Sequence, residues 1–282
     1  LINHGVVNSM KIMTVADNES YKTMLDEELR SRFLASELFQ PGEVNLVLTD
    51  VDRAIVGGVV PLDKPLGLGN PKEVAADFFT QRREVGVLNI GGTGTVTVNG
   101  ENFEMQNRDS LYIGRGNEEV LFSSDSTDEP SRYALFSYPA HTAYPSKRVG
   151  RDEARKLDMG DDGRANDRVI RQSICPGIVD TCQLVMGFTQ LMHGSVWNTM
   201  PPHTHQRRSE IYMYFDIEEG ERVFHFMGEP NKFRSIVTKS GEAVVSPSWS
   251  VHFGVGTRPY TFIWSMGGEN QVFDDMDGFS FD

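Results

Sequence analysis

The chain has 282 residues, of which 39% are hydrophobic and 24% are charged, a composition typical of one large or two ordinary globular domains. Its formal net charge of −13 argues against nucleic acid or an anionic membrane as the main partner. An anionic substrate would therefore need a local group of Arg or Lys side chains to hold it against the overall negative field.

Cysteine content and hydropathy favour a cytoplasmic protein. The two cysteines, Cys175 and Cys182, are predicted to be reduced thiols rather than a disulfide or a metal pair. No apolar run approaches the length needed to span a bilayer. The first ten residues lack the basic and apolar regions of a signal peptide.

One short helix is predicted near the N-terminus. Thr23 is its candidate N-cap, Asp26 falls in its first turn, and Leu25, Leu29 and Phe33 recur every four residues. From Leu38 onward the pattern changes to short apolar runs broken by Gly, Pro, Asn and Asp, which predicts strands.

Strand signals fill the rest of both halves of the chain. The stretch VGVLNIGGTGTVTVNG (85–100) predicts two strands joined by a tight glycine turn, and Asn99-Gly100 is a strong hairpin signal. A polar, charge-rich segment (144–167) is predicted to be a surface linker between a first barrel (1–143) and a second (168–282). RREVGVLNIGG followed by RDSLYIGRG has the same rhythm as RRSEIYMYFDI followed by SGEAVVSPSW, which indicates a duplicated β-barrel unless the similarity is chance.

A candidate metal site lies in PPHTHQRRSEIYMYF (201–215). Alternate residues of a strand face the same side, so His203 and His205 are expected to point into one cavity. For the same reason Glu210 shares a face with Tyr212 and Tyr214. Two imidazoles and a carboxylate suit a divalent transition metal and leave positions open for water or substrate.

The fourth ligand is expected from His252, in GEAVVSPSWSVHFGVG (241–256). A His-x-His pair followed by Glu, then a Gly, a Pro six residues later and a further His, matches the two-part signature of the cupin superfamily. The fold predicted is therefore mainly β, a bicupin of two tandem jelly-roll barrels with a short N-terminal helix. No histidine stands at the positions of the first half that correspond to the His pair, and Glu119 stands about where His252 does, so the first barrel is expected to lack a metal.

At these residues the chain resembles a narrower family, the 4-deoxy-L-threo-5-hexosulose-uronate ketol-isomerases. The resemblance extends from about Phe33 to Asp277 and is carried by RREVGVLNIGG, NTMPPHTHQRRSEIYMYF, SPSWSVHFGVGT and YTFIWSMGGENQVFDDMD. It implies one Zn²⁺ per subunit, a homohexamer, and a role in the bacterial breakdown of pectin and related polyuronides. The zinc ligands that it implies are His203, His205, Glu210 and His252.

The reaction that the resemblance implies converts 5-dehydro-4-deoxy-D-glucuronate to 3-deoxy-D-glycero-2,5-hexodiulosonate. The base is left open among a metal-bound hydroxide, Tyr212, Tyr214 and a residue of another strand or subunit, and both tyrosines are equally well explained as core. A metal-assisted hydride shift is left open as the alternative to an enediolate route. Arg207 and Arg208 are candidates to bind the substrate carboxylate, with a solvated arginine pair as the alternative. Two other functions use the same ligand set: an Fe(II) cupin dioxygenase and a non-catalytic sugar-binding cupin.

Overall fold

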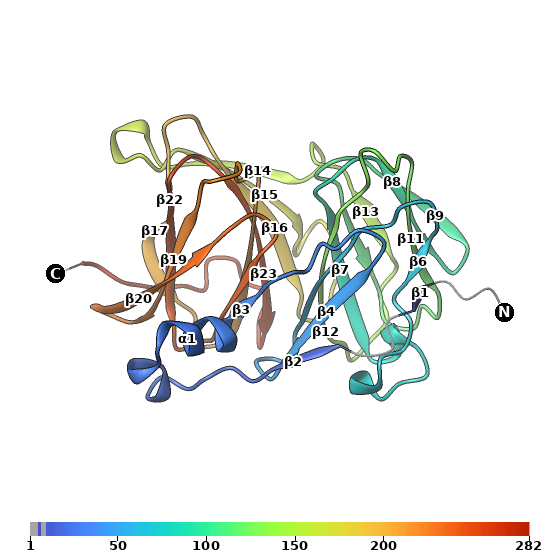
Figure 1. The fold of residues 1–282 in the computed structure, drawn as a ribbon, viewed down its shortest axis with the longest axis horizontal. Helices are drawn as coiled ribbons and strands as arrows, with labels where there is room; N and C mark the ends of the chain where they lie inside the picture. The colour runs from blue at the N-terminus through green and yellow to red at the C-terminus, as the bar shows by residue number, and fades with distance from the viewer. Residues whose placement is uncertain (1–4, 7–9, 282) are drawn as a thin grey trace.

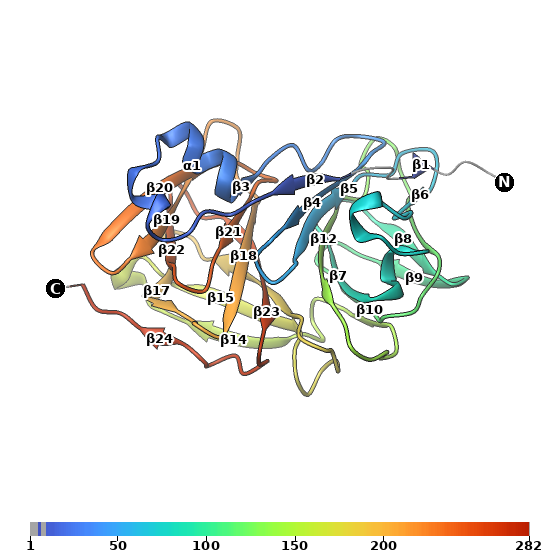
Figure 2. The same ribbon diagram turned by 90° about the horizontal axis from the view of Figure 1, so that it is seen from below.

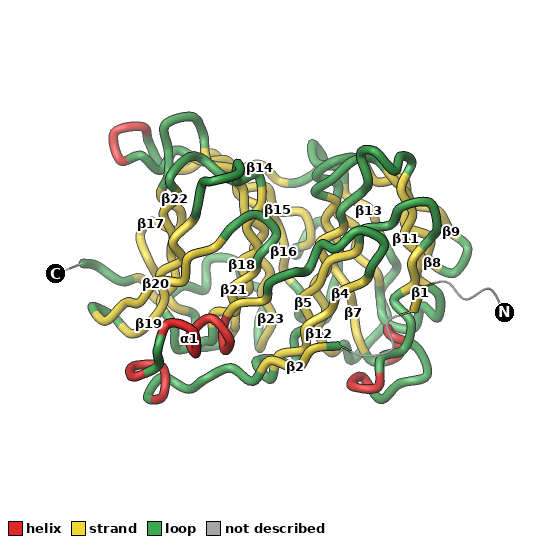
Figure 3. The backbone as a smooth tube through the Cα atoms, in the orientation of Figure 1, coloured by secondary structure: helices red, strands yellow, loops and turns green. Residues whose placement is uncertain are grey.

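The structure, a computed structural model, describes residues 5–6 and 10–281. Two β-barrels lie side by side along the long axis of the molecule (Figure 1), and strands dominate both of them (Figure 3). No helix among the described residues is long and apolar enough to cross a membrane. Of the first ten residues, to which the prediction on a signal peptide applies, only 5, 6 and 10 are among the described residues.

The first barrel consists of a five-stranded and a seven-stranded sheet. In spatial order, the smaller sheet contains β1 (Gly5–Val6), β6 (Leu66–Gly67), β11 (Val120–Ser124), β8 (Gly94–Val98) and β9 (Glu101–Met105). The larger sheet contains β13 (Lys147–Val149), β10 (Ser110–Ile113), β7 (Arg83–Asn89), β12 (Tyr133–Pro139), β5 (Ile55–Val59), β4 (Val44–Thr49) and β2 (Lys11–Met13). Two short 3-10 helices, η2 (Lys72–Val74) and η3 (Phe79–Gln81), precede β7.

The second barrel repeats this plan. Its seven-stranded sheet contains β14 (Arg155–Met159), β15 (Arg168–Ile174), β16 (Val185–Leu191), β23 (Thr261–Gly268), β18 (Arg208–Phe215), β21 (Ala243–Ser246) and β3 (Leu34–Ala35). Its five-stranded sheet contains β20 (Lys232–Thr238), β19 (Val223–Glu229), β22 (Val251–Gly256), β17 (Trp197–Thr204) and β24 (Asp277–Gly278). A 3-10 helix, η4 (Asp162–Arg164), lies between β14 and β15.

The two barrels share one topology. The antiparallel run β4-β5-β12-β7-β10 of the first barrel has the same order as β15-β16-β23-β18-β21 of the second. The segments that were matched by sequence rhythm, RREVGVLNIGG and RRSEIYMYFDI, hold the equivalent strands β7 and β18. The prediction of a mainly β bicupin is thus confirmed.

The segment 144–167, expected to be an irregular linker, contributes a strand to each barrel. Its β13 pairs with β10 of the first barrel, and its β14 pairs with β15 of the second. Backbone hydrogen bonding to existing sheet edges orders this segment despite its polar composition. The division of the chain at residues 143 and 167 stays a prediction.

The N-terminal segment crosses to the second barrel. Helix α1 (Asp26–Phe33) follows the 3-10 helix η1 (Ser20–Thr23), and both lie beside the second barrel, as Figures 1 and 2 show. The helix begins after Leu25, whose backbone N–H donates to the Glu28 carboxylate at 2.8 Å. Thr23 instead ends η1 and is not the N-cap, and Leu25 is exposed while Leu29 and Phe33 are buried, which corrects the predicted cap and apolar face.

Side-chain alternation creates three separate cores. Along β18, Ile211 and Met213 point to a core between the two seven-stranded sheets, shared with Tyr112 and Phe136 of the first barrel. The alternate residues of β18 point into the second barrel, together with side chains of β19 and β23. The interior of the first barrel is a third apolar cluster. Because both faces of β18 are covered, every residue of the strand is buried.

Candidate metal centre

Two neighbouring strands and one facing strand bring the predicted ligands together. His203 on β17 pairs directly with His252 on β22, so both imidazoles leave the same face of the five-stranded sheet. His205 follows β17 one residue after its end. Glu210 lies on β18 of the opposite sheet and points inward, toward the histidines.

The three imidazoles form a nearly equilateral triangle. Their ring centroids are 5.1 Å apart for His203 and His205, and 5.0 Å apart for each of these with His252. One Glu210 oxygen, Oε2, lies 3.1 Å from His205 Nε2 and 2.8 Å from His252 Nε2. One possible ligand atom from each of the four residues lies within 4.8 Å of the others. This cluster could hold a metal ion.

The protonation of His252 supports this fit. Its Nδ1 lies 3.1 Å from the carbonyl oxygen of Ser250, and because a carbonyl only accepts, Nδ1 must carry the hydrogen. Its Nε2 is buried without a hydrogen-bond partner and faces an oxygen of Glu210 at 2.8 Å. A ring nitrogen and a carboxylate oxygen this close need a proton or a metal ion between them, and a Nδ1–H bond to a backbone carbonyl is the usual way to orient a metal-binding histidine.

The electrostatics favour the ligand forms of the residues. Burial, together with the neighbouring His252, lowers the pKa of His203 to about 3, so its imidazole is neutral and able to donate a lone pair. For Glu210, burial alone would raise the carboxyl pKa, but His252 and His205 outweigh burial and lower it well below its ordinary value. A neutral imidazole at His203 and an ionised carboxylate at Glu210 are both forms that bind Zn²⁺ and similar divalent ions.

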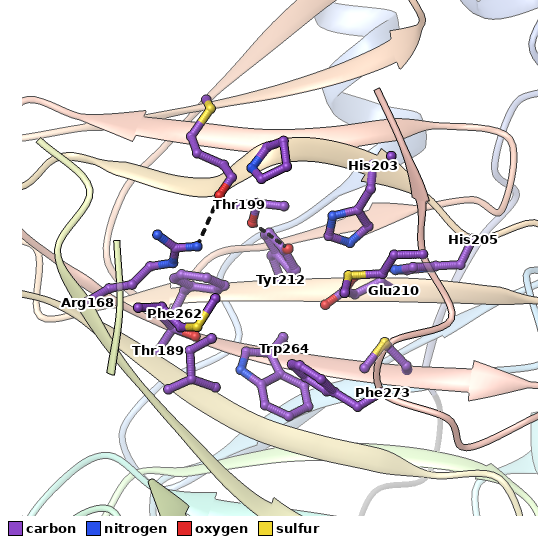
Figure 4. Close-up of a pocket in the computed structure, with 17 residues that line it drawn as sticks. Arg168, Thr189, Thr199, His203, His205, Glu210, Tyr212, Phe262, Trp264 and Phe273 are labelled. Carbon is purple, nitrogen blue, oxygen red and sulfur yellow. Dashed lines mark hydrogen bonds and ion pairs between the residues drawn. The ribbon is translucent and has the colours of Figure 1, made fainter. Parts of the chain in front are cut away.

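The cluster opens on a cavity of about 210 Å³ inside the second barrel. Figure 4 shows His203, His205 and Glu210 at one end of this cavity and Arg168 at the other, with Tyr212 and Thr199 between them. Phe262, Trp264 and Phe273 form an apolar wall along its length. The pairing of β17 with β22 shifts register between Asn198 and His203, and residues 199–201 of this irregular stretch line the cavity.

The two tyrosines proposed as bases differ in position. The Tyr212 hydroxyl faces the cavity and lies 2.8 Å from the Thr199 hydroxyl. Burial, followed by the nearby charge of Glu210, raises its pKa well above the ordinary value, so the phenol is protonated at neutral pH. Tyr214 is not among the cavity-lining residues, and its hydroxyl bonds His225 Nδ1 at 2.7 Å in the barrel core.

Neither arginine predicted to bind the substrate carboxylate lines this cavity. Arg207 pairs with the chain's own Asp275 and with Asp277, the latter at 3.0 Å. Arg208 is fully buried and donates to the backbone carbonyls of Val272 at 2.7 Å and Asp275 at 3.1 Å. Both guanidinium groups hold the C-terminal segment in place, and their positions give no support to the predicted role.

Sequence reasoning missed the polar residues at the far end of the cavity. Arg168 is the first residue of β15, where it directly follows a charge-rich stretch and looks like part of it. The signal that could have found it is alternation, since Arg168 and Ile170 both line the cavity from the same strand. Thr199 lines the cavity from the irregular stretch of β17, which the sequence does not predict.

Two tandem barrels of this topology, with a His-x-His, Glu and His set inside the second, define the chain as a bicupin. A solved IolB-like protein from Salmonella typhimurium LT2 has this fold, with a TM-score of 0.68, 12% identity, and coverage of 89% of this chain and 96% of its own. Bacillus subtilis oxalate decarboxylase is a more distant structural neighbour, with a TM-score of 0.53 and 10% identity over 78% of this chain and 70% of its own.

The chain belongs to the KduI/IolB family, whose model matches residues 35–278. A relative from Lachnoclostridium phytofermentans, named 4-deoxy-L-threo-5-hexosulose-uronate ketol-isomerase, is 47% identical over 95% of this chain and 97% of its own. A protein of the same name from Escherichia coli strain SE11 is 48% identical over 91% of this chain and 93% of its own. The resemblance predicted from the sequence is confirmed, and with it an enzyme of the isomerase class.

Proposed function

We propose that the chain is a zinc-dependent ketol-isomerase that converts 5-dehydro-4-deoxy-D-glucuronate to 3-deoxy-D-glycero-2,5-hexodiulosonate in the breakdown of pectin and related polyuronides. The observation that carries this proposal is a complete three-histidine, one-glutamate cluster that opens on a cavity, in a chain 47% identical to a named uronate ketol-isomerase. Zinc fits the donor set because neutral imidazole and carboxylate are its usual ligands outside cysteine sites.

The reaction moves a proton between two neighbouring carbons. The substrate is an aldehyde at C1 with a hydroxyl at C2, and the product is a ketone at C2 with a hydroxyl at C1. The C2 proton is removed, an enediolate forms across C1 and C2, the O2 hydroxyl proton passes to O1, and C1 is reprotonated, so no external oxidant or reductant is needed. Zinc, when bound, supplies Lewis acidity that polarises the carbonyl and stabilises the negative charge of the enediolate.

The chain's own residues prepare the cavity for this step. His203, His205, Glu210 and His252 would hold the zinc ion. The protonated phenol of Tyr212 faces the same space and can donate a hydrogen bond to a substrate oxygen as negative charge develops there. The apolar wall of Phe262, Trp264 and Phe273 limits the access of water, which strengthens these polar interactions.

An assay of the purified protein on the keto-uronate, with and without a chelator, tests this function. We expect turnover that is lost with the chelator and restored by zinc, and metal analysis that finds about one zinc per chain. Iron in the purified protein together with substrate-dependent oxygen uptake would instead establish a dioxygenase. Binding of the sugar acid without turnover in the zinc-loaded protein would establish a non-catalytic cupin.

The proposal includes a cytoplasmic setting and a homo-oligomer. Cys175 and Cys182 are both free thiols, which suits a reducing compartment. An aromatic cluster on the second barrel, with Phe233, Phe279 and the half-exposed Phe281 in mutual contact, is the kind of surface that subunit contacts cover. The family resemblance suggests a hexamer. Size-exclusion chromatography with light scattering would measure the molar mass of the oligomer.

A further inference from the structure

Arg168 places a buried cation in the cavity. Its side chain lies at the start of β15 and the residue is only 6% exposed. Nη1 donates to the carbonyl oxygen of Asn166 at 2.9 Å, and Nη2 donates to that of Met200 at 3.2 Å. These bonds use two of the five N–H donors of a guanidinium group. No carboxylate of the described residues forms an ion pair with it.

An unpaired buried charge is costly. Moving a cation out of water costs several kcal/mol even after the protein relaxes, and a partner anion offsets part of this. Burial lowers the pKa of Arg168, yet a guanidinium stays protonated at neutral pH. Arg83 and Arg208 are buried too, but neither lines the cavity. Arg208 lines a separate, more open pocket, where its guanidinium is engaged by the carbonyls of Val272 and Asp275. Arg168 alone among these three therefore faces the cavity that also contains the metal ligands.

The position of Arg168 relative to the metal ligands matches a linear uronate. Figure 4 shows the guanidinium at the opposite end of the cavity from His203 and Glu210. A linear six-carbon uronate carries its aldehyde at C1 and its carboxylate at C6, so the reacting end and the charged end also lie at opposite ends of the molecule. Phe262 lies between the two ends of the cavity, where the methylene at C4 of a 4-deoxy sugar needs no hydrogen bond.

We propose that Arg168 binds the C6 carboxylate of the substrate while the four-ligand cluster holds the C1–C2 end, so that Arg168 selects uronates over neutral sugars. The inference rests on the function proposed above. It replaces Arg207 and Arg208 in the carboxylate-binding role, because their guanidinium groups are engaged by the C-terminal segment and lie outside the cavity.

Binding of two matched probes to the metal-loaded protein tests this inference. L-Gulonate is a six-carbon chain with a carboxylate at one end and a hydroxyl at the other, and D-glucitol is the same length without the carboxylate. We expect the wild type to bind L-gulonate more tightly, and Arg168→Gln to reduce this preference by about 10- to 100-fold, the loss expected for charge-assisted hydrogen bonds. Arg168→Lys, which keeps the charge but not the fork, should retain an intermediate preference.

Two further variants separate the role of Arg168 from a general effect of losing an arginine. Arg171→Gln changes the same strand at a side chain that bonds the Arg151 carbonyl outside the cavity, and it should keep the full preference. Arg207→Gln should keep it as well. If Arg168 binds the carboxylate, Arg168→Gln should keep the metal content of the wild type and change the ratio of the two probe affinities. A purely structural role would instead alter metal content or thermal stability without changing that ratio.

The outcomes distinguish this inference from the proposed function. Normal turnover of the keto-uronate, with an unchanged KM and probe preference in Arg168→Gln, would overturn the inference and leave the function standing. Loss of the preference in Arg207→Gln but not in Arg168→Gln would return the role to Arg207. A wild type without any preference would also overturn it. An Arg168-dependent preference in a protein that does not turn over the keto-uronate would sustain the binding role and reject the isomerase.

Discussion

Replacing His252 tests whether the four-ligand cluster binds a metal that the reaction needs. Its Nε2 is buried, has no hydrogen-bond partner and faces Glu210 at 2.8 Å. We expect His252→Ala to lose bound metal and to lower kcat/KM about a thousandfold or more, because metal assistance contributes several kcal/mol to such a step. Metal analysis beside the assay measures both effects.

A matched control for His252→Ala is His193→Ala, since His193 is exposed on the same half of the chain. That variant should keep both metal and activity. A folded His252→Ala protein that binds no metal and isomerises at the wild-type rate would contradict a metal role in the reaction.

Tyr212 and Tyr214 form a second test, because they lie two residues apart on β18 with different hydrogen-bond partners. Tyr212→Phe removes the hydroxyl beside Thr199 and keeps the ring contact with Phe262, whose centroid is 4.7 Å away. We expect kcat to fall about 100-fold, the lower end of what a positioned proton donor contributes. Tyr214→Phe should keep kcat near the wild-type value and cost stability of about 1–3 kcal/mol, because His225 loses a buried partner. Equal losses of kcat in the two variants would remove Tyr212 from the reaction.

At the residue scale, sequence spacing predicted the metal ligands but not the contacts that the C-terminal segment makes with the arginines. His203 and His205 share a cavity because strand side chains alternate, and the cupin signature supplied His252. Because Arg207 and Arg208 lie close to these ligands in the sequence, they were predicted to bind the substrate carboxylate. Their partners are Asp275 and the Val272 carbonyl, more than sixty residues later in the chain, and no local pattern shows that contact.

At the scale of elements, β7 and β18 show how one topology serves two purposes. Val85 pairs with the last residue of β10, as Glu210 pairs with the last residue of β21, so the two positions are equivalent. Val87 correspondingly matches Tyr212. The first barrel therefore points Val85 and Val87 into an apolar core where the second barrel points Glu210 and Tyr212 toward a cavity.

The C-terminal segment is an element whose position the arginines determine. Phe273, Met276 and Gly278 line the cavity, while Arg207 binds Asp275 and Asp277 on the same segment. We expect Arg207→Ala to raise KM several-fold for any ligand of the cavity, because one wall is released. The melting temperature should change little, because ion pairs that keep contact with solvent contribute little to stability. Limited proteolysis should cut the segment faster in this variant.

Lys232→Ala is a suitable control for Arg207→Ala, since it removes a well-exposed charge from a surface ion pair elsewhere on the second barrel. Resistance to proteolysis in Arg207→Ala equal to that of the wild type and of Lys232→Ala would show that the segment is held by its other contacts, such as Arg208.

At the scale of the whole molecule, the outer faces of the two seven-stranded sheets form one core. Leu88, Phe136 and Tyr138 of the first barrel belong to the same buried cluster as Phe188 and Met213 of the second. Sequence periodicity predicted the strands but not this packing, because a strand that is buried on both faces has no polar side to mark its orientation. With a shared core of this kind, neither barrel can unfold without exposing apolar surface of the other.

Glu84 makes the coupling between the barrels testable. This fully buried side chain of β7 accepts hydrogen bonds from the backbone N–H groups of Cys182, Gln183 and Leu184 at 2.7, 2.9 and 2.8 Å, and from the Tyr112 hydroxyl at 2.9 Å. Glu84→Gln keeps the shape but turns an amide N–H₂ toward donors, which should cost about 2–4 kcal/mol of unfolding free energy. Calorimetry should show one unfolding transition for Glu84→Gln, as for the wild type, with its midpoint lower by roughly 4–16 °C. The control Glu104→Gln, at an exposed position of β9, should leave the midpoint unchanged. Two separate transitions in the wild type would mean that the barrels unfold independently, and a shift of only one of them in Glu84→Gln would confine the role of this carboxylate to its own barrel.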